Sequence, residues 1–284
     1  MLGNLVRLIR PKHYVKNGLI FLPILFSGNF FKLDYLETLF LALVAFCATA
    51  SIVYVINDIR DKAQDRQHPT KKNRPIASGA VSIGQAWGLV AVLAIIAGVF
   101  SYLSHMPIYG YVILAVYLVI NIFYSFGLKN VPVVDVVILA AGFVLRVLYG
   151  GEVVDIDVSR WMYLTVLVAA VYMGLGKRRA ELTSNGAKSR KVNKFYTHNF
   201  LDKNMYVFLS LTLVFYSLWA TDPSRTGSLF WTIPIVMVIL MTYSLGVEKD
   251  NSTGDPTDII LGNKVLVLLG VVYAVLTTFL LYVK

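Results

Sequence analysis

The sequence has few charged residues for its length. Only 15% of its 284 residues are Asp, Glu, Lys or Arg, 57% are hydrophobic, and the mean hydropathy is +0.67. A soluble domain of this length carries more charge, and apolar runs of roughly 20 residues recur along the whole chain. The composition excludes a soluble globular protein and predicts an all-α, polytopic membrane protein, one integral domain over residues 1–284.

The chain also lacks the residue patterns of several common sites. Its single cysteine, Cys47, lies inside an apolar run, and its four histidines are scattered without ligand spacing. No Ser/His/Asp or Cys/His arrangement can be recognised. The net charge is +10, but the cations cluster at the ends of apolar segments, where membrane topology and anionic substrates explain them better than nucleic acid.

Hydropathy predicts nine membrane spans, preceded by an amphipathic stretch from Asn4 to Tyr14. The spans cover roughly residues 17–31, 35–57, 83–104, 108–127, 131–150, 160–176, 204–221, 228–247 and 264–283. On the side shared by the N-terminus and the loops after the even-numbered spans lie 21 of the 26 Lys and Arg. This asymmetry predicts a multi-pass protein of the cytoplasmic (inner) membrane with its N-terminus in the cytoplasm.

The most informative stretch lies at the end of the second span, from Asn57 to Asp65. If the helix continues through it, Asp58, Asp61 and Asp65 lie within an arc of roughly 60° on one face. Three crowded carboxylates repel one another, and hard oxygen ligands of this kind suit Mg²⁺ together with substrate phosphates. The alternative is a solvated acidic helix end. The six nearby cations argue against this alternative.

Those cations and three further polar positions complete the candidate site. The cations near the Asp stripe are Arg60, Lys62, Arg66, Lys71, Lys72 and Arg74. Lys129 follows Tyr124 and Ser125 by about one helical turn, and its alternative role is to set membrane topology. Arg146 lies near the middle of the fifth span, where a charge is expensive and usually faces a cavity with a partner. Asn121 shares the helix face of Ser125 and could equally be a helix-packing amide.

Three motifs resemble the UbiA superfamily of intramembrane prenyltransferases. They are Asn57-Asp58-x-x-Asp61-x-x-x-Asp65, Arg74-Pro-Ile-x-Ser78-Gly79 and Tyr124-Ser125-x-x-Leu128-Lys129. The resemblance covers essentially the whole chain. It implies helices around a central cavity that opens to the bilayer, capped by polar loops, and a Mg²⁺-dependent transferase.

One departure points to a branch of that superfamily. Typical members carry a second D-x-x-x-D motif after the sixth span, whereas this chain reads Lys177-Arg178-x-x-Glu181. With Arg10-Pro11-Lys12-His13-Tyr14-Val15-Lys16-Asn17, this is similar to the polyprenyl-phosphate phosphoribosyltransferases, including those that act on decaprenyl phosphate. The resemblance implies phosphoribosyl pyrophosphate as donor and a polyprenyl phosphate as acceptor. Lys177 and Arg178 would then answer the additional phosphate of that donor.

The resemblance implies a role for each candidate residue. Asp58, Asp61 and Asp65 are expected to bind the metal and, with Lys129 and Arg146, to be catalytic. The expected substrate-binding residues are Lys16, Asn17, Asn57, Arg60, Arg66, Lys71, Arg74, Asn121, Tyr124, Ser125, Lys177, Arg178 and Glu181.

Two other functions are compatible with parts of the pattern. An aromatic prenyltransferase would use a prenyl diphosphate donor, but Lys177 stands where that reading expects an acid. A cation transporter would use the Asp stripe as an ion site, yet such sites usually lie near the midplane of the membrane rather than at the end of a span. The sequence leaves the lipid chain length and the oligomeric state open.

The charge asymmetry yields a testable topology. Cysteines introduced at Gln67 and Ala187 should react with a membrane-impermeant thiol reagent only from the cytoplasmic face, and Lys284 should lie outside. Labelling of either cysteine in intact cells from outside would contradict the orientation.

Overall fold

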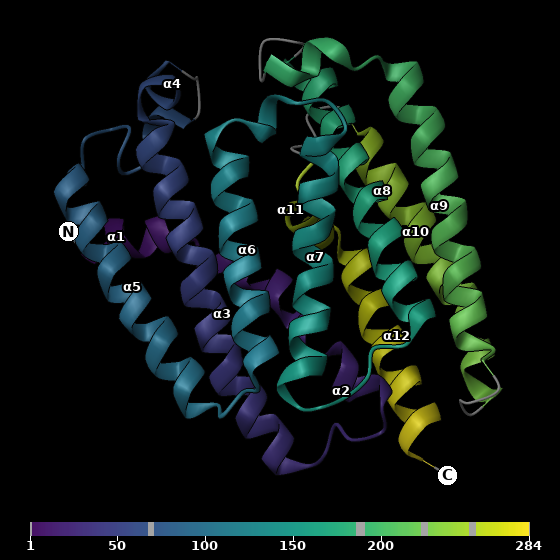
Figure 1. Ribbon diagram of the computed structural model, residues 1–284. Helices are drawn as coiled ribbons and strands as arrows, with labels where there is room; N and C mark the ends of the chain where they lie inside the picture. Colours follow the sequence, from purple (N-terminus) through teal and green to yellow (C-terminus); the bar gives the residue numbers. More distant parts are fainter. Residues whose placement is uncertain (1, 68–70, 186–190, 223–226, 250–253, 284) are drawn as a thin grey trace. The chain divides into compact units, whose positions relative to one another are not determined.

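The computed structural model describes residues 2–67, 71–185, 191–222, 227–249 and 254–283, and every regular element in those ranges is a helix (Figure 1). The helices group into two compact units. Unit 1 comprises residues 1–128 and 145–157, and unit 2 comprises residues 129–144 and 158–284. Helix α7 (Val134–Val153) therefore contributes its first half to unit 2 and its second half to unit 1.

Unit 1 is built around the long helix α3. Its elements are α1 (Leu2–Ile9), η1 (Pro11–Phe21), α2 (Leu22–Phe26), α3 (Leu33–Arg60), α4 (Lys62–Arg66), η2 (Lys71–Asn73), α5 (Ile83–Leu103) and α6 (Ile108–Phe126). Helix α3 packs along α5, its neighbour in Figure 1, and also contacts α1, η1 and α6. Small residues such as Ala42, Ala45 and Ala50 are fully buried on α3, which lets neighbouring backbones approach closely.

Unit 2 is also helical and has its own buried core. After η3 (Leu128–Asn130) and the first half of α7, its elements are α8 (Arg160–Asn185), η5 (Lys191–Phe195), α9 (His198–Ala220), η6 (Gly227–Thr232), α10 (Ile233–Glu248), α11 (Pro256–Gly262) and α12 (Lys264–Tyr282). Helices α8 and α9 lie side by side, and α10 contacts both. Tyr172, Val192, Leu201 and Val247 form the centre of the buried cluster.

The apolar helices make this an integral membrane protein. Six described helices are long and apolar enough to cross a membrane, namely Leu33–Arg60, Ile83–Leu103, Ile108–Phe126, Val134–Val153, Leu229–Glu248 and Lys264–Tyr282. The apolar residues of α5 and α6 are mostly exposed, as expected for side chains that face lipid. Helices α8 and α9 cover the predicted spans 160–176 and 204–221. The all-α membrane fold is confirmed, whereas a count of nine spans is not.

The first predicted span differs from its prediction. Residues 17–31 do not form one helix, because η1 is a 3₁₀-helix that passes into the five-residue α2, and the chain turns at Gly28 with φ of +79°. Pro11 and Pro23 each remove a backbone donor. A 3₁₀ segment of 11 residues is unusually long and is held by tertiary packing, with Asn17 and Ile20 buried.

One of these packing contacts is a close approach between the backbones of Gly150 in α7 and Ile20 in η1. A Cβ atom at this position would lie 1.9 Å from the carbonyl oxygen of Ile20 in η1. Only the absence of a side chain allows the two backbones to meet, so Gly150 fixes the position of η1 within unit 1.

Two sequence predictions remain predictions. The orientation of the N-terminus and the single domain over 1–284 are not decided by the helices themselves. The labelling position Ala187 lies outside the described residues.

We expect Gly150→Ala to destabilise the chain by about 1–3 kcal/mol, as overpacking of a close contact does. Thermal unfolding of the full chain in detergent, followed by tryptophan fluorescence, measures the change. The matched control is Gly98→Ala in α5, where nothing lies within 4 Å of an added Cβ. Equal melting temperatures for the two variants would contradict the role of Gly150.

Candidate functional site

The Asp stripe lies where α3 ends. Helix α3 stops at Arg60, and Asp61, with φ of −83° and ψ of 1°, joins it to the single turn of α4. The backbone stays close to helical, since the Asp61 N–H donates to Asn57 O and the Asp65 N–H to Asp61 O. Asp58 and Asp65 are buried, at 3% and 4% exposure, whereas Asp61 is only partly buried. The predicted continuation of the helix is therefore correct except for a local break at Asp61.

Two guanidinium groups hold the buried carboxylates. Arg10 Nη2 donates to Asp58 Oδ1 at 2.5 Å, and Arg74 Nη1 lies 3.1 Å from the same oxygen and 2.7 Å from Asp65 Oδ2. Arg74 thus bridges the first and last acids of the stripe, and it comes from the loop after η2. A buried carboxylate without such a partner would be strongly destabilising, so these pairs compensate the burial of both acids and hold them in place.

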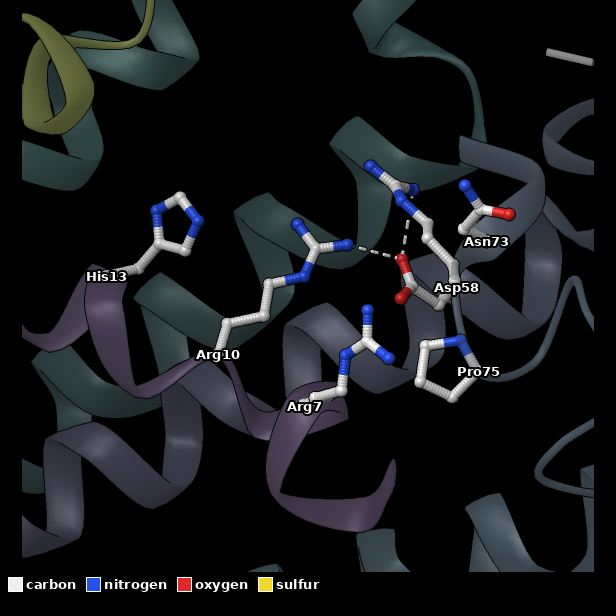
Figure 2. Close-up of a pocket in the computed structure, with 7 residues that line it drawn as sticks. Arg7, Arg10, His13, Asp58, Asn73 and Pro75 are labelled. Carbon is white, nitrogen blue, oxygen red and sulfur yellow. Dashed lines mark hydrogen bonds and ion pairs between the residues drawn. The ribbon is translucent and has the colours of Figure 1, made fainter. Parts of the chain in front are cut away.

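A polar pocket of about 310 Å³ opens beside Asp58 (Figure 2). It is lined by Arg7, Arg10, His13, Asp58, Asn73, Arg74 and Pro75. In Figure 2 the guanidinium groups of Arg7 and Arg10 lie near the Asp58 carboxylate, with Asn73 beside it. Cationic side chains outnumber the single carboxylate in this lining, so the pocket attracts anions.

Sequence reasoning found only part of this pocket. Asp58 and Arg74 were predicted as site residues, whereas Arg7, Arg10, His13 and Asn73 were not. The available signal was the three-residue spacing of Arg7 and Arg10 in the amphipathic stretch, which places both on one side of a helical turn.

The other residues predicted near the stripe have structural contacts. Arg60 Nη2 donates to Phe126 O at 3.0 Å, with its guanidinium 4.2 Å from the Phe126 ring centre. Arg66 Nε donates to Ala77 O at 3.0 Å. None of Lys16, Asn57, Arg60, Asp61, Asp65, Arg66 and Lys71 lines the pocket described above. Their contacts with substrate remain predictions.

Arg146 is the centre of a second polar cluster in unit 1. It is 5% exposed, donates from Nε to Asn17 Oδ1 at 2.8 Å and from Nη2 to the Tyr117 hydroxyl at 3.2 Å, and lies 5.1 Å from the ring centres of Phe46 and Tyr117. The sequence predicted a partner for the Arg146 charge. The structure provides the Asn17 amide, the Tyr117 hydroxyl and two aromatic rings. Arg146 therefore links α7 to η1 through Asn17 and to α6 through Tyr117. Asn17 also donates to Cys47 Sγ of α3.

The polar residues of α6 have modest surroundings. The Asn121 amide donates to Tyr117 O one turn earlier, Ser125 is buried, and Tyr124 is half-buried. Lys129, in η3, is half-buried in unit 2. These observations leave the predicted substrate contacts of all four residues as predictions.

In unit 2, Arg178 is fully buried between acids. Its Nε lies 2.7 Å from Asp135 Oδ2, and its Nη1 contacts Glu181 Oε2. Asp135 Oδ1 accepts a hydrogen bond of 2.6 Å from the Tyr196 hydroxyl, which itself accepts from the Val133 N–H at 2.7 Å. Burial and the neighbouring Asp135 raise the pKa of Tyr196, so the phenol stays protonated and remains a donor.

The two cations of the Lys177-Arg178 motif therefore have different surroundings. Lys177 Nζ lies 3.2 Å from Asp255 Oδ2 and its side chain is 23% exposed, whereas the side chain of Arg178 has no exposed surface. Arg178 ties α8 to α7 through Asp135 in this structure. The predicted contacts of Lys177, Arg178 and Glu181 with substrate remain predictions. The roles of Asp135 and Tyr196 could not be recognised from the sequence.

The residues of the stripe fit a divalent cation by their chemistry. Within the described ranges no three His, Cys, Asp or Glu side chains come together as a ligand group, because Arg74 lies between Asp58 and Asp65. Asp58 and Asp65 nevertheless each direct only one carboxylate oxygen at a guanidinium group. The second oxygen of each is a hard ligand of the type that Mg²⁺ prefers, and Asp61 lies between them at the junction of α3 and α4.

Comparison with known proteins shows what the chain is similar to. The model of the UbiA prenyltransferase family matches residues 21–256. Decaprenyl-phosphate phosphoribosyltransferase of Corynebacterium glutamicum is 32% identical, covering 99% of this chain and 87% of that protein. The enzyme of the same name from Mycolicibacterium smegmatis is 33% identical, covering 95% and 89%.

Solved structures share the fold. A UbiA homolog from Archaeoglobus fulgidus bound to DMAPP and Mg²⁺ aligns with a TM-score of 0.75 at 16% identity, covering 99% of this chain and 100% of that one. The apo structure of a UbiA homolog from Aeropyrum pernix aligns at 0.61 with 15% identity, covering 94% and 96%.

The surroundings of Arg178 predict a stability effect. Arg178→Met removes the cation that lies 2.7 Å from the fully buried Asp135, and we expect a loss of about 3–5 kcal/mol of unfolding free energy. The control is Arg179→Met, since Arg179 pairs with Asp202 at the surface and such pairs contribute only about 0–1 kcal/mol. Thermal unfolding in detergent separates the two variants, and similar melting temperatures would refute the buried clamp.

Proposed function

This chain belongs to the UbiA prenyltransferase family, and from that premise we propose that it transfers the 5-phosphoribosyl group of phosphoribosyl pyrophosphate to a polyprenyl phosphate. The coarser assignment, a membrane transferase of this family, follows from membership itself. The names of relatives that are 32% and 33% identical over nearly the whole chain support the choice of donor and acceptor.

One observation carries the proposal: a polar pocket in which guanidinium groups surround a buried carboxylate. A donor with a diphosphate and a separate phosphate brings several negative charges in a small volume. Arg10 and Arg74 provide planar forks that match phosphate oxygens, and Asp58 provides a ligand for the accompanying cation. A prenyl diphosphate, by comparison, carries no phosphate besides its diphosphate.

Asp58, Asp61 and Asp65 are the residues proposed to hold Mg²⁺. When bound, the ion supplies neutralisation of the diphosphate leaving group. Arg74 already lies between Asp58 and Asp65, so its guanidinium can be transferred from carboxylate to phosphate oxygens without leaving the site.

The reaction proposed is a displacement at the anomeric carbon of the ribose. The bond from C1 to the diphosphate oxygen breaks, a phosphate oxygen of the lipid forms the new bond to C1, and pyrophosphate leaves with the electron pair. Positive charge builds on the sugar as the first bond loosens, and fixed charges stabilise the separating groups. The lipid phosphate is already an anion, so no general base is required.

The remaining assignments are proposals from the sequence. We place the lipid phosphate at Lys129 or Arg146. The lipid tail would remain in the bilayer and the soluble donor would enter from the cytoplasm. If Arg146 binds the lipid phosphate, it does so with its guanidinium group, which Asn17 and Tyr117 already hold in position.

The test is transfer of label from radiolabelled phosphoribosyl pyrophosphate into a polyprenyl phosphate by the purified full chain with Mg²⁺. We expect EDTA to abolish transfer reversibly, and Asp58→Asn, Asp61→Asn and Asp65→Asn each to lower kcat/KM at least about tenfold, or about 1.4 kcal/mol. Asp34→Asn, at the exposed first turn of the same helix, is the matched control and should retain full activity.

Label that stays in the aqueous phase with wild-type protein would refute the proposed reaction. Efficient transfer of a prenyl group from a prenyl diphosphate to an aromatic acid would instead support the aromatic prenyltransferase. Full activity of the three Asp variants would show that Asp58, Asp61 and Asp65 form only a helix end and have no role in the reaction.

A further inference from the structure

We infer that the pocket beside Asp58 contains a separate subsite for a phosphomonoester, formed by Arg7 with Arg10, His13 and Asn73. The inference rests on the proposed function only in naming its occupant, the 5-phosphate of the ribosyl donor. The subsite itself follows from the charge, packing and polarity of the lining.

The charges of the pocket leave one guanidinium group available. Arg10 and Arg74 are engaged with Asp58 and Asp65, whereas Arg7 makes no ion pair within the described part of the chain although it lines the same pocket. The Arg7 side chain is exposed to solvent, so its charge is accessible to an anion that enters the pocket. Arg7 is therefore positioned for a ligand rather than for a protein carboxylate.

The pocket is formed in advance by buried neighbours of its cations. Leu8, next to Arg7, and Ile76, two residues after Arg74, are both fully buried in the same apolar cluster with Val55 of α3. These anchors fix α1 and the loop after η2 against α3. The ordering of both segments therefore precedes binding, which favours affinity for a small ligand.

Arg10 is held by its backbone and by an aromatic ring. It separates α1 from η1 in the left-handed conformation, with φ of 54°, an unusual state for a residue other than glycine. Its guanidinium carbon lies 5.2 Å from the centre of the Tyr54 ring, and the His13 ring is 5.7 Å from the same ring. Local backbone strain of this kind is found where surrounding structure fixes a functional side chain.

The lining selects a soluble phosphate over a lipid phosphate. Six of the seven lining residues are polar or charged, and Pro75 is the exception. A polyprenyl chain requires apolar walls, which this pocket does not offer. A volume of about 310 Å³ lies near the lower limit of small-molecule pockets and suits a sugar phosphate.

This subsite replaces Lys177 and Arg178 as the place for the additional phosphate. Arg178 is fully buried against Asp135 and Glu181, and Lys177 is paired with Asp255. Both cations already have carboxylate partners in unit 2. Arg7 is the cation that lines a pocket without an ion pair in the ranges described.

The direct test measures binding of ribose 5-phosphate to the full chain in detergent with EDTA present, by titration calorimetry. This probe carries the phosphomonoester but no diphosphate, so its binding should not require metal. We expect wild-type protein to bind it, Arg7→Gln to weaken binding about tenfold or more, and Arg7→Lys to weaken it less. The control Lys12→Gln removes an exposed charge from the same segment outside the lining and should leave binding unchanged.

Kinetics distinguish the two sources of phosphate. Arg7→Gln should raise the KM for phosphoribosyl pyrophosphate about tenfold and leave the KM for polyprenyl phosphate unchanged. The reverse pattern would overturn the assignment to the soluble donor. Absence of ribose 5-phosphate binding to wild-type protein, or equal binding by Arg7→Gln, would overturn the subsite.

Failure of the proposed function gives a different result. If no label enters lipid but ribose 5-phosphate binding still depends on Arg7, the subsite stands and the transfer reaction is wrong. If label enters lipid but Arg7→Gln behaves as wild type in both assays, the transfer stands and the subsite is wrong.

Discussion

The ion pairs at the end of α3 are the interaction on which unit 1 depends. Asp58, in the last turn of α3, and Asp65, in α4, are both buried, and an unpaired carboxylate would be unstable there. Their partners come from two other segments, the junction of α1 and η1, which is 48 residues from Asp58, and the loop after η2, which is 9 residues from Asp65. The same contacts that satisfy the carboxylates therefore bring Arg10 and Arg74 together, with Arg7 and Asn73 beside them. The same ion pairs therefore stabilise unit 1 and assemble the cationic pocket.

A similar constraint acts within unit 2. Ion pairs join Arg178 to Asp135 and Glu181, and the Tyr196 hydroxyl donates a hydrogen bond to Asp135, around an Arg178 side chain that has no exposed surface. The Val133 backbone, with φ of 68°, is strained for a β-branched residue, and its N–H is held by Tyr196. Such a network joins the start of α7 to α8 and to the segment after η5. A charged motif that resembles a substrate site in the sequence can thus serve the packing of helices.

Much of the fold could be predicted because lipid imposes one simple rule. Long apolar runs such as Ile83–Leu103 and Lys264–Tyr282 must form helices, since no other open segment satisfies its backbone in a bilayer. That rule fails for residues 17–31, where the chain packs against α3 and α7 and the contact of Ile20 with Gly150 supports a 3₁₀-helix. Hydropathy measures transfer into lipid and carries no information about such a contact.

The candidate site could be predicted where its side chains follow a local pattern in the sequence, and not where they meet partners from other segments. The spacing of Asp58 and Asp65, seven residues apart in the sequence, corresponds to about two helical turns, so the sequence reveals it. Arg10 and Arg74, which reach Asp58, are 48 and 16 residues away from it in the sequence. Their positions depend on how α1 and the loop after η2 pack through Leu8 and Ile76. For the same reason Arg178 could be recognised as a charge but not as a buried one. Long side chains of Arg reach partners in many directions, and only tertiary packing decides whether a given guanidinium faces a carboxylate or remains for a ligand.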